Sequence, residues 1–238
     1  MKTVLLFHHL GLGDHIMFNG LVRSIAESSN VILMVWERYF KEVSFMFSDI
    51  DIKYCRLFIE TQEEVDYKIK HTPHDEFIIV GKHNCVNGRK YTIEETGILR
   101  HDEYKSAGVD PSFMHTKFYI PRDIFMEDFV YKLFANKRYI IVHDDPSRNI
   151  KLDMSRIPEK EVEIFYIGQN RNNFTRHFNM FHMYKIMMNA DAFHGYESSW
   201  SWLFELWKIP IKKYLHVYVR DDYINEVYYD KKYWTFLK

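Results

Sequence analysis

The sequence has few cysteines and no long apolar run. Of its 238 residues two are cysteine, Cys55 and Cys85, which is too few for a disulfide framework, and a metal site would need other ligands. No stretch reaches the roughly 20 apolar residues of a membrane-spanning helix, and the first residues lack the apolar region of a secretory signal. We therefore expect a soluble, cytoplasmic protein without a transmembrane segment, in which both cysteines are ordinary thiols.

An excess of charge of one sign is also missing. The 32 basic residues balance 33 acidic ones, so no basic stripe marks a nucleic-acid binder. The 13 histidines form no His-Glu-x-x-His pattern and no convergent ligand set, so we expect neither a metal site nor a cofactor. Hydrophobic residues (47%) and aromatic residues (17%) are abundant, which is typical of a folded globular protein. Most aromatic side chains fill a core in this interpretation, with Trp200 and Trp202 as candidates for sugar contact.

Strand and helix signals alternate along the chain. Short apolar runs predict strands at 2–7, 31–36, 50–55, 77–80, 139–143, 162–167, 191–194 and 211–215. Apolar residues at helical spacing predict helices at 14–25, 39–47, 125–134, 180–188 and 198–207. Such alternation is typical of a parallel sheet with helices on both faces.

The alternation restarts between residues 121 and 138, which predicts two Rossmann-like halves in an α/β fold. We place an N-terminal domain at 1–125 and a C-terminal domain at 126–220, the second of them abbreviated. The tail, 221–238, is rich in aromatic and charged residues and is expected to pack back as a helix.

The first motif is the loop after the first predicted strand, Gly11-Leu-Gly13-Asp14. A glycine pair lets the backbone turn off a strand and approach a ligand, and the helix that follows favours an anion. A dinucleotide fingerprint would need a third glycine where Ile16 stands. Asp14 is either the N-cap of the helix or a general base that faces a substrate hydroxyl at the rim of a cleft, and one residue can do both.

The second motif is the polar loop after the predicted strand at 139–143. It begins at His143 and carries Ser147, Arg148 and Lys151. Two cations at the carboxyl end of a strand suit the diphosphate of a nucleotide sugar. A solvated charged turn is the alternative interpretation.

The third motif follows the predicted strand at 191–194 and reads Gly195-Tyr-Glu197-Ser198-Ser199. Serine hydroxyls and free N–H groups at a helix N-terminus can bind a phosphate. Glu197 can accept hydrogen bonds from sugar or ribose hydroxyls. Alternatively, Ser198 is a plain N-cap.

In this order the motifs resemble the ADP-heptose:lipopolysaccharide heptosyltransferase family, glycosyltransferase family 9. Residues 10–25 resemble its N-terminal signature of strand, Gly-Asp pair and helix, and residues 187–210 resemble its most recognisable stretch. The resemblance implies a two-domain GT-B fold, in which the two halves face each other across a cleft. It also implies a metal-independent, inverting transfer from a nucleotide-sugar donor to a glycan or other hydroxyl acceptor.

The resemblance assigns the acceptor to domain 1–125 and the donor to domain 126–220, with Asp14 as the base. The loop at Gly168 and Gln169 occupies the place where the family's second C-terminal loop borders the nucleotide, although a simple turn is equally consistent. The donor-binding residues so implied are Gly13, His143, Ser147, Arg148, Lys151, Gly168, Gln169, Glu197, Ser198 and Ser199. Heptose is the family's label, so the sugar, the nucleotide and the acceptor stay open.

Two other functions remain open at this point. A nicotinamide-dependent oxidoreductase would use Glu37, which follows the second predicted strand where a ribose-binding acid belongs, but Ile16 breaks its fingerprint. A non-catalytic nucleotide-sugar or glycan-binding protein would keep the same loops without turnover.

Overall fold

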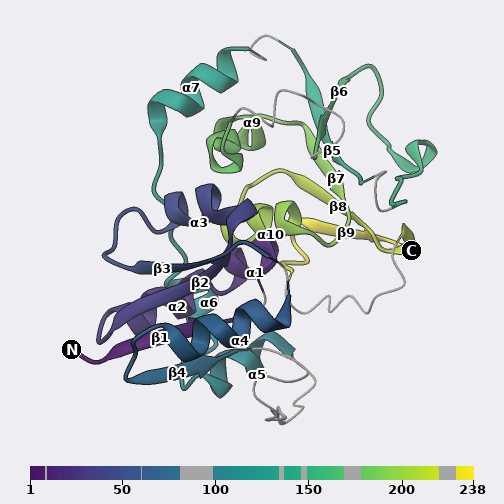
Figure 1. Cartoon of the computed structure of the whole chain (residues 1–238). Coiled ribbons are helices and arrows are strands. Elements are labelled where there is room, and N and C mark those ends of the chain that lie inside the picture. The colour runs from purple at the N-terminus through teal and green to yellow at the C-terminus, as the bar shows by residue number, and fades with distance from the viewer. Residues whose placement is uncertain are drawn as a thin grey trace. The chain divides into compact units, whose positions relative to one another are not determined.

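The computed structural model divides the chain into two compact units, unit 1 (Met1–Pro121) and unit 2 (Arg122–Lys238). Both units are α/β (Figure 1). The structure describes residues 1–8, 10–59, 61–80, 99–133, 137–145, 149–168, 178–219 and 229–238.

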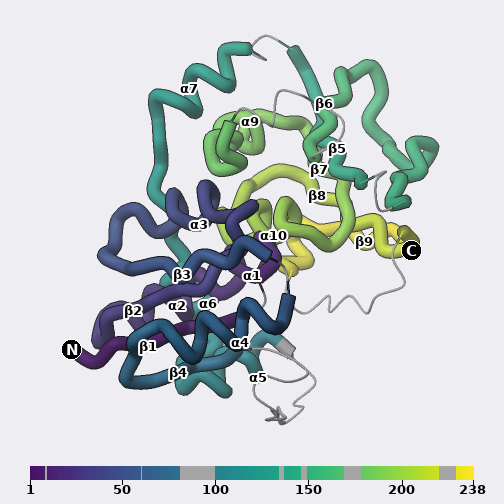
Figure 2. The backbone as a smooth tube through the Cα atoms, in the orientation of Figure 1, coloured from purple at the N-terminus to yellow at the C-terminus, as the bar shows by residue number. Residues whose placement is uncertain are grey.

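Four strands form a parallel sheet in the described part of unit 1 (Figure 2). They are β1 (Thr3–Phe7), β2 (Asn30–Trp36), β3 (Lys53–Leu57) and β4 (Glu76–Ile79). The spatial order β3-β2-β1-β4 reverses at β1, because β2 and β3 are added on one side of it and β4 on the other. In such sheets ligands bind beyond the carboxyl ends of the strands at this switch point.

The helices of unit 1 cover both faces of its sheet. The helical elements are α1 (Leu12–Met17), α2 (Asn19–Ala26), η1 (Glu37–Tyr39), α3 (Phe40–Met46), α4 (Gln62–His71), α5 (Leu99–Ser106) and α6 (Phe113–Thr116). Right-handed connections place α4 on the opposite face from α2 and α3, because the chain moves the other way along the sheet to reach β4. Val65 and Ile69 of α4 are buried there against Leu5 and Met34.

The last segment of unit 1 is bound to α2 by a buried amide. Asn19 Nδ2 donates to the Tyr119 carbonyl, and Asn19 Oδ1 accepts from the Tyr119 N–H, each at 3.0 Å. Arg23 Nε donates to the same carbonyl at 3.0 Å. A Cβ at Gly20 would overlap the Phe113 carbonyl, so glycine is needed for α6 to lie this close to α2.

Unit 2 has a second parallel sheet, of five strands among its described residues. They are β5 (Tyr139–His143), β6 (Glu163–Ile167), β7 (Ala192–Gly195), β8 (Lys212–His216) and β9 (Trp234–Leu237). In the order β6-β5-β7-β8-β9 the direction reverses between β5 and β7. The loops after these two strands therefore flank the switch point of unit 2.

The helical elements of unit 2 include one, α10, in which every residue after Ser199 is buried. They are α7 (Ile124–Lys132), η3 (Met154–Arg156), η4 (Met180–Met183), α9 (Tyr184–Met188), α10 (Ser199–Leu206) and η5 (Val217–Val219). In α10 the Phe204 ring stacks on Phe193 of β7 at 4.0 Å. Lys213 Nζ donates to the Ile209 carbonyl just beyond the helix at 2.9 Å, and burial lowers the pKa of Lys213 to about 8.

Several elements differ from the sequence-based expectations. The predicted helix at 14–25 is two helices, α1 and α2, which meet at Phe18. Helix α4 was not predicted, although Thr61 accepts from the Glu64 N–H at 3.3 Å as an N-cap does. The prediction of a helical tail is wrong for Trp234–Leu237, because these strand-favouring residues pair with β8 and bury Trp234.

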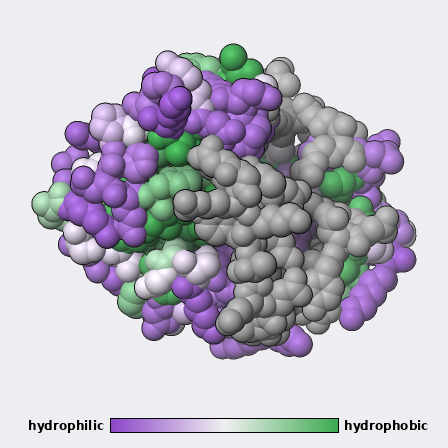
Figure 3. All heavy atoms as spheres, turned by 60° about the horizontal axis from the view of Figure 1, so that its bottom comes forward, coloured by the Kyte–Doolittle hydropathy of each residue, from purple (hydrophilic) through white to green (hydrophobic). Residues whose placement is uncertain are grey.

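On the face shown in Figure 3, hydrophobic residues gather in small patches among hydrophilic ones. Among the described helices, none combines the length and the apolar character of a segment that crosses a bilayer.

Candidate functional site

Asp14 lies at the switch point of unit 1, in the turn from β1 into α1. Gly11, with extended backbone, is the N-cap of α1 and makes no side-chain cap bond, so Asp14 lies inside the first turn of the helix. The interpretation of Asp14 as the N-cap is therefore wrong, because the helix begins at Leu12, before it. The Asp14 side chain is 22% exposed, so its carboxylate is open to a ligand.

The Asp14 carboxylate has a different neighbour at each oxygen. An ideal Cβ on Gly11 would lie 2.7 Å from Asp14 Oδ2, so glycine is needed for the carboxylate to fold back over the turn. Arg100 Nη2 of α5 lies 3.4 Å from Asp14 Oδ1. Sequence reasoning missed Arg100, because the Arg100–Asp14 ion pair forms only through tertiary packing and no sequence motif indicates it.

His15 is fully buried directly after Asp14. Its ring meets His8 edge to face at 4.4 Å, and neither His15 ring nitrogen has a hydrogen-bond partner among the described residues. Burial, and secondly His8, hold the pKa of His15 well below its ordinary value. His15 is therefore a neutral ring at neutral pH.

In unit 2, His143 and Gly168 come together at the ends of β5 and β6. His143 Nδ1 lies 2.9 Å from the Ile167 carbonyl oxygen. Gly168 has φ 138°, and a Cβ there would lie 3.2 Å from the Asp144 carbonyl oxygen, so both backbone and space favour glycine. The His143 ring stacks on Tyr196 with centroids 4.9 Å apart. Sequence reasoning missed Tyr196, although it stands directly before Glu197 in the third motif.

The start of α10 carries the half-buried residues Glu197, Ser198 and Ser199. Ser198 is the N-cap, but its hydroxyl accepts from the Ser201 N–H at a long 3.5 Å. The buried Ser201 hydroxyl makes shorter bonds: it accepts from the Ser198 N–H at 2.9 Å and donates to the Ser198 carbonyl at 2.8 Å. Ser201 therefore carries most of the cap, and the Ser198 hydroxyl is held weakly.

The remaining donor-side residues are placed only in part. Lys151 is exposed and follows a two-way backbone bridge between Asp145 and Ile150, each bond 2.9 Å long. In unit 1, Gly13 is half-buried in the first turn of α1. The residues Ser147, Arg148 and Gln169 lie outside the described residues.

The two tryptophans of α10 belong to the core. Trp202 is 2% exposed and stacks on Tyr229 at 5.3 Å, and Trp200 is 7% exposed. The expectation that they contact sugar is therefore wrong, because α10 is packed on every side and its aromatic rings fill that packing.

A chain of hydrogen bonds links buried rings of β7 and β8. Glu159 Oε2 lies 2.9 Å from His194 Nε2, and His194 Nδ1 lies 3.1 Å from His216 Nε2. His216 Nδ1 lies 2.9 Å from the Tyr218 hydroxyl. Burial lowers the pKa of His194 and brings that of His216 to about 4, so both rings are neutral at neutral pH.

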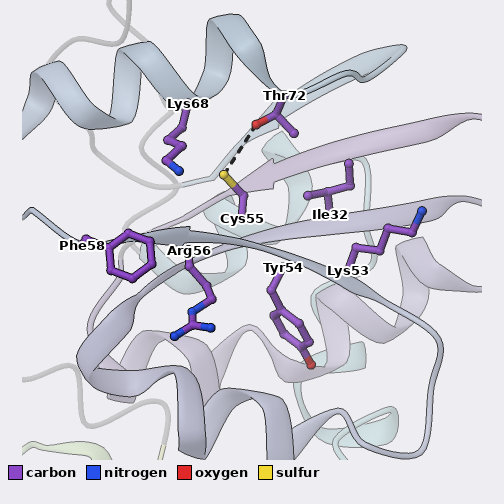
Figure 4. A pocket seen from close by; sticks show the side chains of 8 residues that line it. All are labelled: Ile32, Lys53, Tyr54, Cys55, Arg56, Phe58, Lys68 and Thr72. Carbon is purple, nitrogen blue, oxygen red and sulfur yellow. Dashed lines mark hydrogen bonds between the residues drawn. The ribbon is translucent and has the colours of Figure 1, made fainter.

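A pocket of about 360 Å³ opens between β3 and α4 of unit 1 (Figure 4). It is lined by Ile32, Lys53, Tyr54, Cys55, Arg56, Phe58, Lys68 and Thr72, and so by no predicted site residue. The Cys55 thiol contacts the Thr72 hydroxyl at 3.6 Å, whereas Cys85 lies outside the described residues. Within the described ranges, no three or more His, Cys, Asp or Glu side chains are grouped as metal ligands.

Glu37, the residue that a nicotinamide-dependent enzyme would need for ribose, is engaged elsewhere. Both of its oxygens accept hydrogen bonds from Arg56, and these bonds hold the pKa of Glu37 below its ordinary value. A ribose would have to displace this guanidinium.

The fold can be compared with known proteins. No protein-family model matches the sequence, and no curated protein matches it. A glycosyl transferase family 9 structure from Veillonella parvula matches with a TM-score of 0.60 and 11% identity, over 99% of this chain and 85% of that one. The fold of this chain is thus similar to that of a solved glycosyltransferase. E. coli ADP-heptose lps heptosyltransferase II matches with a TM-score of 0.57 and 8% identity, over 91% of this chain and 85% of that one.

A third structure, E. coli heptosyltransferase WaaC with ADP-2-deoxy-2-fluoro heptose, matches with a TM-score of 0.51 and 9% identity, over 100% of this chain and 93% of that one. At such identities the likeness is one of fold. It confirms the predicted fold class, α/β with two Rossmann-like halves of the GT-B kind.

Proposed function

We propose that the protein is a glycosyltransferase that moves a sugar from a nucleotide-sugar donor to a hydroxyl acceptor, such as a glycan. The observation that carries the proposal is the place of Asp14. It is a partly exposed carboxylate in the first turn after β1, at the switch point of a sheet with the glycosyltransferase fold. A ligand bound at this switch point would contact the Asp14 carboxylate. A carboxylate in that position can take the proton from a ligand hydroxyl.

The reaction is a single displacement with inversion. The acceptor hydroxyl loses its proton to an Asp14 oxygen while its own oxygen forms a bond to C1 of the sugar. The bond from C1 to the donor phosphate breaks on the opposite face, and the nucleoside diphosphate leaves with the electron pair. Acceptor contacts belong to unit 1 in this proposal.

Donor contacts belong to unit 2. The weakly held Ser198 hydroxyl and the N–H groups that begin α10 support phosphate binding, because a helix N-terminus favours anions. Glu197 accepts from sugar or ribose hydroxyls, and Lys151 is an exposed cation for the diphosphate. His143 and Gly168 line the donor site, and the motif residues Ser147, Arg148 and Gln169 complete it.

We assign the stabilisation of the leaving diphosphate to these cations and N–H groups, so no metal takes part. Transfer should then be unchanged by a chelator such as EDTA. The proposal includes a cytoplasmic location.

The test compares two carboxylate variants in unit 1. Asp14→Asn removes the proton acceptor, and turnover of the nucleotide sugar should fall by about 100-fold to 10,000-fold. Asp51→Asn is the matched control, because Asp51 is exposed and precedes β3. It therefore lies beyond the amino end of a strand, whereas Asp14 lies beyond the carboxyl end of β1. Donor release is followed by mass spectrometry over a panel of nucleotide sugars, and folding by circular dichroism.

Each outcome of the panel decides between functions. Turnover that Asp14→Asn abolishes and Asp51→Asn leaves intact supports the proposal. Unchanged turnover in the Asp14→Asn protein would refute the role of the base. Nucleotide-sugar binding without turnover favours a binding protein, and thermal stabilisation by NAD(P) alone favours the oxidoreductase.

A further inference from the structure

Arg100 joins Asp14 to a second, buried carboxylate. Its Nη2 lies 3.4 Å from Asp14 Oδ1, and its Nη1 donates to Glu103 Oε2 at 2.8 Å. The Glu103 side chain is 1% exposed, whereas the Asp14 side chain is 22% exposed. Arg100 thus has one partner in the interior and one at the surface where a ligand arrives.

The guanidinium is held independently of Asp14. Tyr104, one turn along α5, donates its hydroxyl to the Met17 carbonyl of α1 at 2.7 Å and is fully buried. The Arg100 guanidinium carbon lies 5.9 Å from the centre of the Phe18 ring, between α1 and α2. Tyr104 therefore attaches α5 to α1, and Glu103 directs the Arg100 head, whether or not Asp14 is present.

The Asp14 carboxylate is in turn confined from two sides. Its Oδ2 lies over the bare Cα of Gly11, and its Oδ1 faces Arg100. The missing Cβ of Gly11 leaves room for this orientation of the carboxylate, and the ion pair with Arg100 favours it. Reaction rates depend steeply on such orientation, because a misplacement of about 1 Å can cost about 100-fold.

We propose that Arg100, tethered by the buried Glu103, is the positioning residue that orients Asp14 for proton abstraction. This inference rests on the proposed function. The pairing also suits a base that changes charge. When Asp14 takes the proton and becomes neutral, Arg100 keeps Glu103 as its counter-ion, so no unpaired guanidinium is left in a partly buried place.

The test measures turnover and orientation in three variants. Arg100→Ala should lower kcat by about 10-fold to 100-fold and leave KM for the donor within about two-fold, because orientation is lost and not donor binding. Arg100→Lys should recover part of the loss, and added guanidinium ion should raise the activity of Arg100→Ala but not of Asp14→Asn. Glu103→Gln, which loosens the tether, should fall between Arg100→Lys and Arg100→Ala.

The matched control is Arg56→Ala, which removes another arginine–glutamate pair from the same unit, away from Asp14. It should leave kcat unchanged. A merely structural role of Arg100 would lower the melting temperature without rescue by guanidinium, and that result would overturn the proposal. An unchanged kcat in Arg100→Ala would overturn it too.

A crystal structure of the Arg100→Ala protein separates this inference from the proposed function. The Asp14 carboxylate should leave its place over Gly11, whatever reaction the protein catalyses. If the wild type turns over no nucleotide sugar, the proposed function fails, and the crystal structure still decides whether Arg100 orients Asp14. A carboxylate that stays in place refutes the positioning role.

Discussion

The two units have related parallel sheets but build their switch points from different groups. In unit 1 the switch point carries a carboxylate beside a guanidinium, and the adjacent His15 ring has no hydrogen-bond partner among the described residues. In unit 2 the loops carry serine hydroxyls, and a chain of hydrogen bonds joins His194 to His216. The switch point of unit 1 offers a carboxylate to a ligand, and the start of α10 in unit 2 offers serine hydroxyls and backbone N–H groups.

In the proposed function, this difference is a division of labour between proton transfer in unit 1 and anion binding in unit 2. A base needs exposure and a counter-ion, which Asp14 has. Phosphate binding needs hydroxyls and N–H groups that are held in place, which the start of α10 has. In both units the parallel sheet determines where a ligand binds, and the residues that follow its strands determine which groups contact that ligand.

The largest expected effect contrasts two buried histidines. His216→Leu leaves His194 Nδ1 and the Tyr218 hydroxyl without their partner, and the free energy of unfolding should fall by about 3 kcal/mol. His15→Leu replaces a ring whose nitrogens are already unbonded and should change stability by less than about 1 kcal/mol. Urea denaturation of both variants measures the contrast. Equal losses would show that His15 is as firmly bonded as His216.

A smaller effect follows from pH. The pKa of His216 is about 4 in the folded protein, against 6.5 ordinarily, so between these values the unfolded chain binds a proton that the folded protein does not. The free energy of unfolding should therefore decrease as pH falls from 6.5 towards 4, with about 2 kcal/mol due to this residue. Denaturation of the wild type and of His216→Leu at a series of pH values measures that share. A slope that His216→Leu leaves unchanged would contradict the assignment.

The smallest effect sharpens the roles of the two serines of α10. Ser201→Ala removes the shorter cap bonds and should cost about 1 kcal/mol of unfolding free energy, while Ser198→Ala should cost about half as much. Affinity for a nucleotide sugar, measured by calorimetry, should show the reverse order, since the Ser198 hydroxyl is the one proposed to meet the donor. The same order in both measurements would reduce Ser198 to a structural cap.

The fold was largely predictable because its strands are short apolar runs between glycines and helices. The prediction at 139–143 coincides with β5, whose five residues are all buried. The prediction at 50–55 falls short of β3 (Lys53–Leu57), because apolar residues precede that strand in the turn. Helix α4 was not predicted, because Val65 and Ile69 are its only buried residues and they give a weak hydrophobic periodicity. The Thr61–Glu64 capping pattern would have indicated its start.

The candidate site was predictable where it is local in sequence. Asp14 and Ser198 follow strands directly, so the carboxyl-end rule finds them. Arg100 and the Ser201 cap were not foreseen. The first depends on how α5 packs on α1, and the second on which of two nearby hydroxyls turns inward. Tertiary packing determines both contacts, and no sequence motif indicates either of them.

The bond between Asn19 and Tyr119 has a consequence for the order of folding. These residues lie 100 positions apart, and both polar atoms of the Asn19 amide bond the backbone of Tyr119, although Oδ1 also accepts from Arg23 Nε at 3.2 Å. During synthesis the two bonds to Tyr119 can form only after nearly all of unit 1 has left the ribosome. Contacts between residues far apart in sequence slow folding. We therefore expect the segment around Tyr119 to pack on α2 in a late step of the folding of unit 1.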